Sequence, residues 1–189
     1  VRAHRALPHG VIGGAISPAT QDPLNWSVWA VDYGRYAPPF EAGAQAWVSD
    51  VNVCYKRRCI EATRDIWQER YNEARVHWSL AAAGEVLYLV PDAVVEFRSR
   101  YTSLGALASQ RFHWGRLFGQ VRASDASAVR RAMLVLSGPV VPLVLLARHA
   151  GTQRRLGNAA RFARALPNVF TILVAWSAGE GWGALTGRA

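Results

Sequence analysis

Apolar runs and helical patterns alternate along the first two thirds of the chain. Residues 10–16 form a short apolar run with glycines, which predicts a buried strand ending in a turn. Residues 26–36 place aromatic and alanine side chains on one face at helical spacing, and Pro38-Pro39 end the predicted helix. The shorter predicted elements are strands at 46–48 and 51–54 and a helical segment at 56–63.

The clearest helical pattern spans residues 67–83, where apolar side chains make a wide stripe and Gly84 is a suitable C-terminal stop. A strand is predicted at 86–90, ended by Pro91, and a second strand at 93–97. Strand, helix and strand joined by a short glycine turn are typical of α/β proteins. An aromatic, basic helix is then predicted at 104–121.

The pattern changes after Asp125. Residues 132–147 carry no charge but are interrupted by Gly138-Pro139 and Pro142, and residues 166–178 form a second apolar run. Each run is shorter than the roughly 20 residues that a membrane-spanning helix needs. Arginines flank the first run on both sides, which disfavours a simple crossing, so a re-entrant or interfacial helical pair fits better. The alternative is a buried helical hairpin packed on the α/β part.

This pattern predicts two regions. Residues 1–125 form an α/β domain, and residues 126–189 form a hydrophobic, arginine-rich helical region that associates with a membrane. The chain starts at Val1 without an initiator methionine, so we expect residues upstream to be missing from it. No secretory signal pattern opens the sequence.

Composition narrows the function classes. With 51% hydrophobic and 19% charged residues, the chain has enough apolar material for a real core and is not of a disordered class. The formal net charge of +9 suits phosphate, a nucleotide diphosphate or an anionic membrane surface. The two cysteines, Cys54 and Cys59, lack the neighbouring ligands of a zinc site, and a reducing compartment is the default expectation.

Three motifs follow one another between residues 50 and 114. The first is Asp50-Val51-Asn52, followed by Tyr55-Lys56-Arg57; the second is Asn72-Glu73 before a helix ending at Gly84; the third is Gln110-Arg111-Phe112-His113-Trp114. In this order and spacing they resemble the acceptor half of a family 2 (GT-A) glycosyltransferase, over about residues 8–125. The resemblance implies a partial GT-A-like (Rossmann-like) α/β domain, followed here by the C-terminal hydrophobic helical hairpin.

The resemblance also implies roles for six residues. Glu73 matches the catalytic base that takes the proton of the acceptor hydroxyl. Asp50, Asn52 and Trp114 match acceptor-binding positions, and Gln110 and Arg111 match positions that meet the donor diphosphate. From the residues alone, Glu73 could equally be a solvated first-turn acid that stabilises the helix dipole, and Glu69 is a rival base one turn earlier.

The chain departs from the family pattern at several positions. Val51 replaces the usual glycine, and His113 stands where an arginine is expected, so Arg111 or Arg116 would supply the phosphate contact. Phe97 occupies the position of a metal-binding histidine, beside Glu96, and no Asp-x-Asp motif occurs. A divalent metal (Mg or Mn) is therefore expected for the complete enzyme, with ligands outside this chain.

The sequence thus predicts an inverting, family 2-like transferase that moves a sugar from a nucleotide-diphosphate sugar to a glycan or lipid-linked acceptor. We expect it at the cytoplasmic face of the cell membrane, in synthesis of cell-envelope polysaccharide, and inactive alone as a truncated chain. The alternative is a non-catalytic membrane-surface binding module. A nucleic-acid partner is not expected, because the arginines are spread rather than striped and no known motif occurs. His77 is expected to be a packed or hydrogen-bonded histidine.

Overall fold

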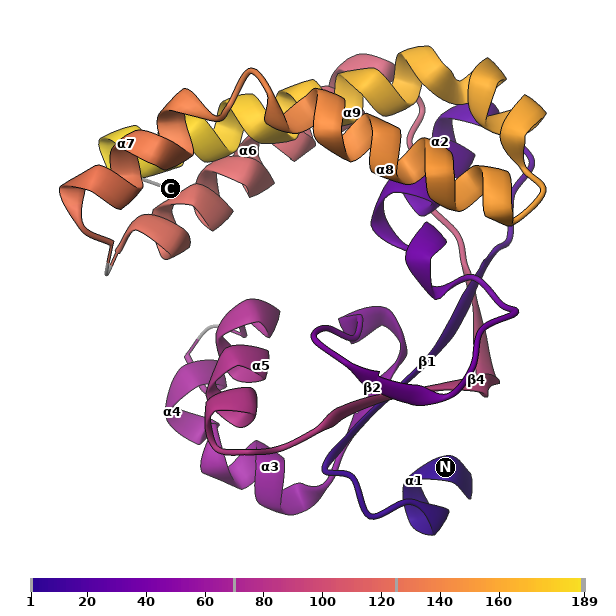
Figure 1. Cartoon of the computed structure of the whole chain (residues 1–189), viewed down its shortest axis with the longest axis vertical. Helices are drawn as coiled ribbons and strands as arrows, with labels where there is room; N and C mark the ends of the chain where they lie inside the picture. The colour runs from indigo at the N-terminus through magenta and orange to yellow at the C-terminus, as the bar shows by residue number, and fades with distance from the viewer. Residues whose placement is uncertain (1, 70, 125, 188–189) are drawn as a thin grey trace. The chain divides into compact units, whose positions relative to one another are not determined.

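The computed structural model describes residues 2–69, 71–124 and 126–187, and has a mixed α/β architecture with a four-stranded mixed sheet (Figure 1). The chain divides into two compact units, which are described separately. Unit 1 consists of Val1–Ala19 with Tyr36–Phe97, and unit 2 of Thr20–Arg35 with Arg98–Ala189. The chain passes from unit 2 back to unit 1 within a short 3-10 helix, η1 (Gly34–Tyr36).

Unit 1 is built on the sheet, in the strand order β2-β4-β1-β3. The strands are β1 (Val11–Pro18), β2 (Gly43–Gln45), β3 (Val53–Tyr55) and β4 (Leu87–Phe97). β1 pairs in parallel with β4 and antiparallel with β3, while β2 is antiparallel to β4. The first six residues of β1 are buried, which explains their continuous apolar character and confirms the predicted strand.

The strand pattern at 86–97 was predicted as two strands, and this is wrong. β4 is one strand, and its pairing with β1 shifts in register between Gly14 and Ala15, opposite Pro91–Ala93. Pro91 has no N–H to donate to the neighbouring strand. A strand tolerates proline at such an irregularity, because the regular hydrogen bonding between the strands is interrupted there. Gly14 is required there, because a Cβ would lie 2.1 Å from the Ala93 carbonyl oxygen. Gly14 therefore lies within a strand and not in a turn.

The helix predicted at 67–83 is shorter in the structure. α4 (Arg64–Trp67) ends where the pattern was expected to begin, and α5 (Glu73–Ala82) starts only after Asn72, whose side chain accepts a hydrogen bond from Arg75 N at 3.0 Å. This N-cap fixes the helix start, whereas the apolar stripe suggested an earlier one. The stop is confirmed, since Gly84 has a φ of 85°. The other helices of unit 1 are α1 (Arg2–Ala6), η2 (Asp50–Asn52) and α3 (Arg57–Ala62).

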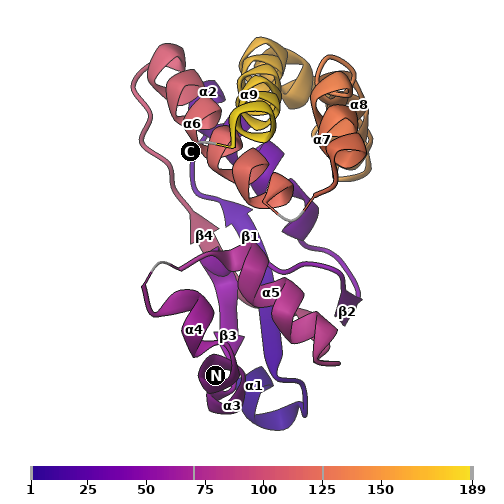
Figure 2. The same cartoon turned by 90° about the vertical axis from the view of Figure 1, so that its left-hand side faces the viewer.

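Unit 2 is helical. Its elements are α2 (Pro23–Asp32), α6 (Leu104–Ala123), α7 (Ala128–Leu136), α8 (Val141–Arg155) and α9 (Ala159–Thr186). α6 and α9 lie side by side (Figure 2) and approach closely at four glycines, Gly115, Gly119, Gly179 and Gly183. Because α2 and α6 pack on α9, the predicted boundary after residue 125 is not a boundary between compact units.

The apolar runs after Asp125 are helical, as predicted. Among the described residues, no single helix is both long and apolar enough to cross a membrane. α7 and α8 together meet the length and composition criteria for a span, but the pair is bent by 64° at the break between them. The second apolar run lies inside the 28-residue helix α9.

Candidate functional site

The six residues predicted to carry function fall in both units. Asp50, Asn52 and Glu73 belong to unit 1, while Gln110, Arg111 and Trp114 belong to α6 of unit 2. Within unit 1 the structure brings Asp50 and Glu73 into direct contact, although they are 23 residues apart.

Glu73 is the first residue of α5, and its carboxylate is turned toward η2. Asp50 N donates a hydrogen bond to Glu73 Oε1 at 2.9 Å. The η2 turn that presents this N–H is held by Ser49, whose hydroxyl accepts from Val51 N at 3.3 Å. The acid is therefore fixed from both sides, by the start of its own helix and by the turn facing it.

The environment of Glu73 favours its protonated form. Burial, and to a smaller extent the negative charge of Asp50, raise the pKa of Glu73 to about 7. The hydrogen bonds from Asp50 N and from the Trp47 side chain act in the opposite direction but are outweighed. A carboxyl group with a pKa near neutrality is suited to general base chemistry, because it can both accept and release a proton there.

A chain of polar side chains continues from Glu73 and was not predicted from the sequence. His77 Nδ1 lies 4.0 Å from Glu73 Oε1, one helical turn on. His77 Nε2 is 2.7 Å from the Tyr55 hydroxyl, which is 3.3 Å from the Tyr71 hydroxyl. The i,i+4 spacing of Glu73 and His77 was the available signal, because such residues share a helix face.

His77 is buried, as expected for a packed histidine. Burial lowers its pKa to about 4, so the imidazole is neutral at pH 7 and does not form an ion pair with Glu73. A neutral imidazole can donate from one ring nitrogen and accept at the other. His77 Nε2 therefore pairs with the Tyr55 hydroxyl without adding charge, whereas Nδ1, which faces Glu73, has no hydrogen-bond partner within the described part of the chain.

Aromatic rings surround this chain. The Trp47 ring meets His77 edge-on at a centroid distance of 5.0 Å and the Trp78 ring at 6.4 Å. Trp78 and Tyr71 are 45% and 47% exposed. Exposed aromatic faces next to a carboxyl group suit the stacking of a sugar ring.

Asn52 lies beside the sheet rather than reaching outward. Its side-chain nitrogen donates to Ala15 O at 2.9 Å and to Ala93 O at 2.7 Å. These bonds join β1 to β4 where their register shifts. Asn52 thus ties η2, the turn that also contains Asp50, to β1 and β4, and acceptor binding by its side chain stays a prediction.

In unit 2, Arg111 is buried and paired. Its guanidinium donates to both oxygens of Asp32, at 3.2 and 2.6 Å, and only 4% of the residue is exposed. Burial raises the pKa of Asp32, and the charge of Arg111 opposes that effect. The ion pair occupies both terminal nitrogens of Arg111, while its buried Nε has no hydrogen-bond partner among the described residues, and its diphosphate contact stays a prediction.

The neighbours of Arg111 differ in exposure. Gln110 accepts a hydrogen bond from the Tyr101 hydroxyl. Trp114 is 54% exposed, and the Arg111 guanidinium carbon lies 5.8 Å from the centroid of its ring. Of the three predicted site residues on α6, Trp114 has the most exposed side chain.

A divalent metal is implied by the resemblance, and the described residues do not supply a site for it. Within ranges 2–69, 71–124 and 126–187, no group of three or more His, Cys, Asp or Glu side chains could hold a metal ion. Phe97 and Glu96 end β4, and a single carboxylate is too few ligands.

In comparisons with known proteins, no protein-family model, curated protein or solved structure matches this chain significantly.

Proposed function

We propose that this chain carries the acceptor half of an inverting, family 2-like glycosyltransferase. The observation that supports this most is the setting of Glu73: a partly buried carboxyl group at a helix start, with a pKa of about 7, beside Asp50 and exposed aromatic rings. The ordered motifs at 50–57, 72–84 and 110–114 supply the substrate class.

The proposed step is a single displacement. The acceptor hydroxyl oxygen attacks the anomeric carbon, and Glu73 takes the proton from that hydroxyl as the new C–O bond forms. The bond between the anomeric carbon and the diphosphate oxygen breaks, and the nucleoside diphosphate leaves with the electron pair. Attack opposite the leaving group inverts the anomeric configuration.

The resemblance also supplies the other proposed contacts, some in each unit. Asp50 holds the acceptor beside Glu73, and the exposed face of Trp114 stacks on a sugar ring. Gln110 and Arg111 face the donor diphosphate, which requires Arg111 to exchange its contact with Asp32. The metal that neutralises a leaving diphosphate is supplied with ligands from outside these residues. The acceptor is a glycan or a lipid-linked glycan at the cytoplasmic face of a membrane.

The test is donor turnover by the protein expressed from its complete reading frame. We expect that frame to include an Asp-x-Asp segment and the protein to release nucleoside diphosphate from at least one sugar nucleotide when acceptor is added. Release is measured across a panel of nucleotide sugars with Mg²⁺ or Mn²⁺. An intact frame that lacks such a segment and turns over no donor would refute the transferase.

The pH dependence of Glu73 tests the site directly. The base must be ionised, so activity should rise with pH through a midpoint near 7. Asp50→Asn removes the second cause of the raised pKa and should shift that midpoint to lower pH, while burial keeps it above the usual value for glutamate. The same shift should be seen by ¹³C NMR titration of the Glu73 carboxyl carbon, without any substrate.

Asp92→Asn is the matched control for this shift. It makes the same charge change within unit 1, and Asp92 is not among the groups that move the pKa of Glu73. If the two variants move the midpoint equally, Asp50 has no special coupling to Glu73.

The alternative function, a non-catalytic membrane-surface module, is favoured by one observation. Residues 126–179 contain seven arginines and no acidic residue. This module would bind anionic membranes regardless of Glu73 and lose binding when the arginines in 148–164 are replaced by alanine.

A further inference from the structure

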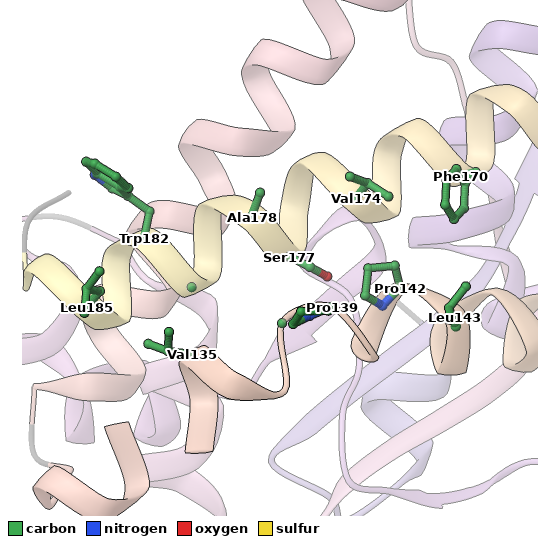
Figure 3. Close-up of a pocket in the computed structure, with 12 residues that line it drawn as sticks. Val135, Pro139, Pro142, Leu143, Phe170, Val174, Ser177, Ala178, Trp182 and Leu185 are labelled. Carbon is green, nitrogen blue, oxygen red and sulfur yellow. The ribbon is translucent and has the colours of Figure 1, made fainter. Parts of the chain in front are cut away.

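An apolar groove lies in unit 2, between α9 and the break that separates α7 from α8 (Figure 3). Its volume is about 630 Å³, within the range of about 300–1,000 Å³ that small-molecule sites occupy. Val135 and Pro142 line one side, and Phe170, Val174, Ser177 and Trp182 line the other.

The break between α7 and α8 creates the groove. α7 ends at Leu136 and α8 begins at Val141, with Pro142 in its first turn, and the two helices are bent by 64°. α9 passes the break without filling it, because Gly181 has no side chain there. A Cβ built on Gly181 meets no atom within 4 Å.

The groove is open and apolar at its rim. Leu143, Phe170 and Trp182 are 58%, 42% and 52% exposed. Further large apolar side chains are exposed on the same helices and in the break between them: Val129, Met133, Leu136, Val140, Val144, Leu166, Val174 and Leu185. Contiguous apolar exposure of this kind marks a surface that binds an apolar partner.

Ser177 gives a second, independent sign of a ligand. It is 4% exposed, and its hydroxyl has no hydrogen-bond partner within the described part of the chain. Figure 3 shows the hydroxyl directed toward Pro142, inside the groove. A buried hydroxyl without a partner is unfavourable, so an oxygen atom of a bound molecule would stabilise it.

The charges around the groove select the kind of molecule. Exposed arginines lie on α7, α8 and α9: Arg130, Arg131, Arg148, Arg154, Arg155 and Arg164. The acidic residue of these helices, Glu180, is paired with Arg122 of α6. An apolar groove with unopposed cationic surface fits a molecule with an apolar chain and an anionic head.

We propose that this groove binds one acyl chain of an anionic phospholipid, with the Ser177 hydroxyl donating to an ester oxygen of that lipid and the arginines attracting its phosphate. The inference rests on the proposed association with a membrane surface but not on sugar transfer. It assigns a defined binding site to a region whose sequence indicated only general membrane contact.

Vesicle binding by the full chain tests the site. The probe is a vesicle of phosphatidylcholine and phosphatidylglycerol, with bromine atoms on the phosphatidylglycerol acyl chains to quench nearby tryptophans. We expect binding with quenching for the parent. Trp182→Phe should remove part of the quenching, whereas Trp78→Phe, which changes a similarly exposed tryptophan in unit 1, should leave the quenched component in place.

A second pair of variants tests whether a side chain that fills the groove weakens binding. Gly181→Leu puts a side chain into the open space, and a helical glycine replaced in this way gains helix propensity. We expect its vesicle affinity to fall by about tenfold, from the loss of roughly two buried methylene contacts. Gly151→Leu on α8, where a Cβ also meets nothing within 4 Å, is the control and should bind like the parent.

The outcomes separate the hypotheses. Vesicle binding without any Trp182 quenching, or equal affinities for the two leucine variants, overturns the groove site while leaving membrane association in place. Binding to pure phosphatidylcholine as tight as to mixed vesicles overturns the anionic head group. A dimer that Gly181→Leu converts to a monomer shows a second copy of the chain in the groove and also overturns the proposal. Transferase turnover is measured separately and decides none of these outcomes.

Discussion

Glu73→Gln should lower the rate of sugar transfer by about 10²–10⁴-fold, the usual contribution of a positioned general base. Glutamine has the same shape and can still accept from Asp50 N, but its amide cannot take a proton from the acceptor. The loss should therefore appear in kcat with little change in the KM for acceptor. The measurement is initial-rate kinetics with the protein from its complete reading frame.

Glu69→Gln is the control for this loss. Glu69 is exposed and lies in a bend before α5, and the sequence alone left it as a rival base. It should retain nearly full activity. If Glu69→Gln is the inactive variant and Glu73→Gln is not, the assignment of the base is wrong.

Glu73→Gln should raise the stability of the fold at high pH although it lowers activity. The folded state raises the pKa of Glu73 from 4.5 to about 7, so the protonated form is favoured by folding. The stability from that form is fully present below pH 4.5 and is lost as pH rises through 7. Glutamine mimics the protonated form, so Glu73→Gln should be more stable than the parent at pH 9 by on the order of 3 kcal/mol, and equal to it near pH 4.

This pair of effects separates a catalytic role from damage to the fold. Chemical denaturation at the two pH values gives the difference in the free energy of unfolding. A variant that is inactive and also less stable at pH 9 would indicate a structural role for the carboxylate instead.

Gly183→Ala should destabilise unit 2 by about 3 kcal/mol, at the upper end of the usual range for overpacking. A Cβ at Gly183 would meet the Arg116 carbonyl oxygen at 1.9 Å and the Arg116 carbonyl carbon at 2.8 Å. Both are backbone atoms of α6, so no side chain can rotate away to make room. Thermal unfolding followed by circular dichroism measures the effect.

Gly181→Ala provides the control two residues away on the same helix. A Cβ there meets nothing within 4 Å, so this substitution should stabilise the helix by about 1 kcal/mol through helix propensity alone. If both alanine variants unfold at the same temperature, α6 and α9 do not pack as closely as described. Gly179→Ala, whose Cβ would be 2.1 Å from Phe112 O, should behave like Gly183→Ala.

The local patterns in the sequence predicted much of the secondary structure. The buried strand at 10–16, the glycine stop at Gly84 and the helix from Leu104 are all present. The errors came from signals that depend on neighbours. Pro91 does not end a strand because β1 shifts register opposite it, and the stripe from Trp67 does not make one helix because Asn72 caps a new one.

The candidate site was only partly accessible from the sequence. Asp50 and Glu73 were both proposed from their motifs, but their contact depends on η2 and α5 lying together in unit 1. Tyr55 belongs to the first motif but Tyr71 and His77 belong to none, and only packing brings the polar atoms of the three residues together. Arg111 was expected at a diphosphate, and the structure places Asp32, 79 residues away, against it.

The sequence by itself determined most of the helical and extended segments, the cationic and apolar character of residues 126–179, and the chemical identity of the acid at the start of α5. These are properties of composition and short-range periodicity, which each residue and its near neighbours fix. The tertiary structure decided the division into units, the raised pKa of Glu73, the pairing of Arg111 and the groove beside α9. Each of these depends on burial and on contacts between residues distant in the chain, and no local pattern encodes them.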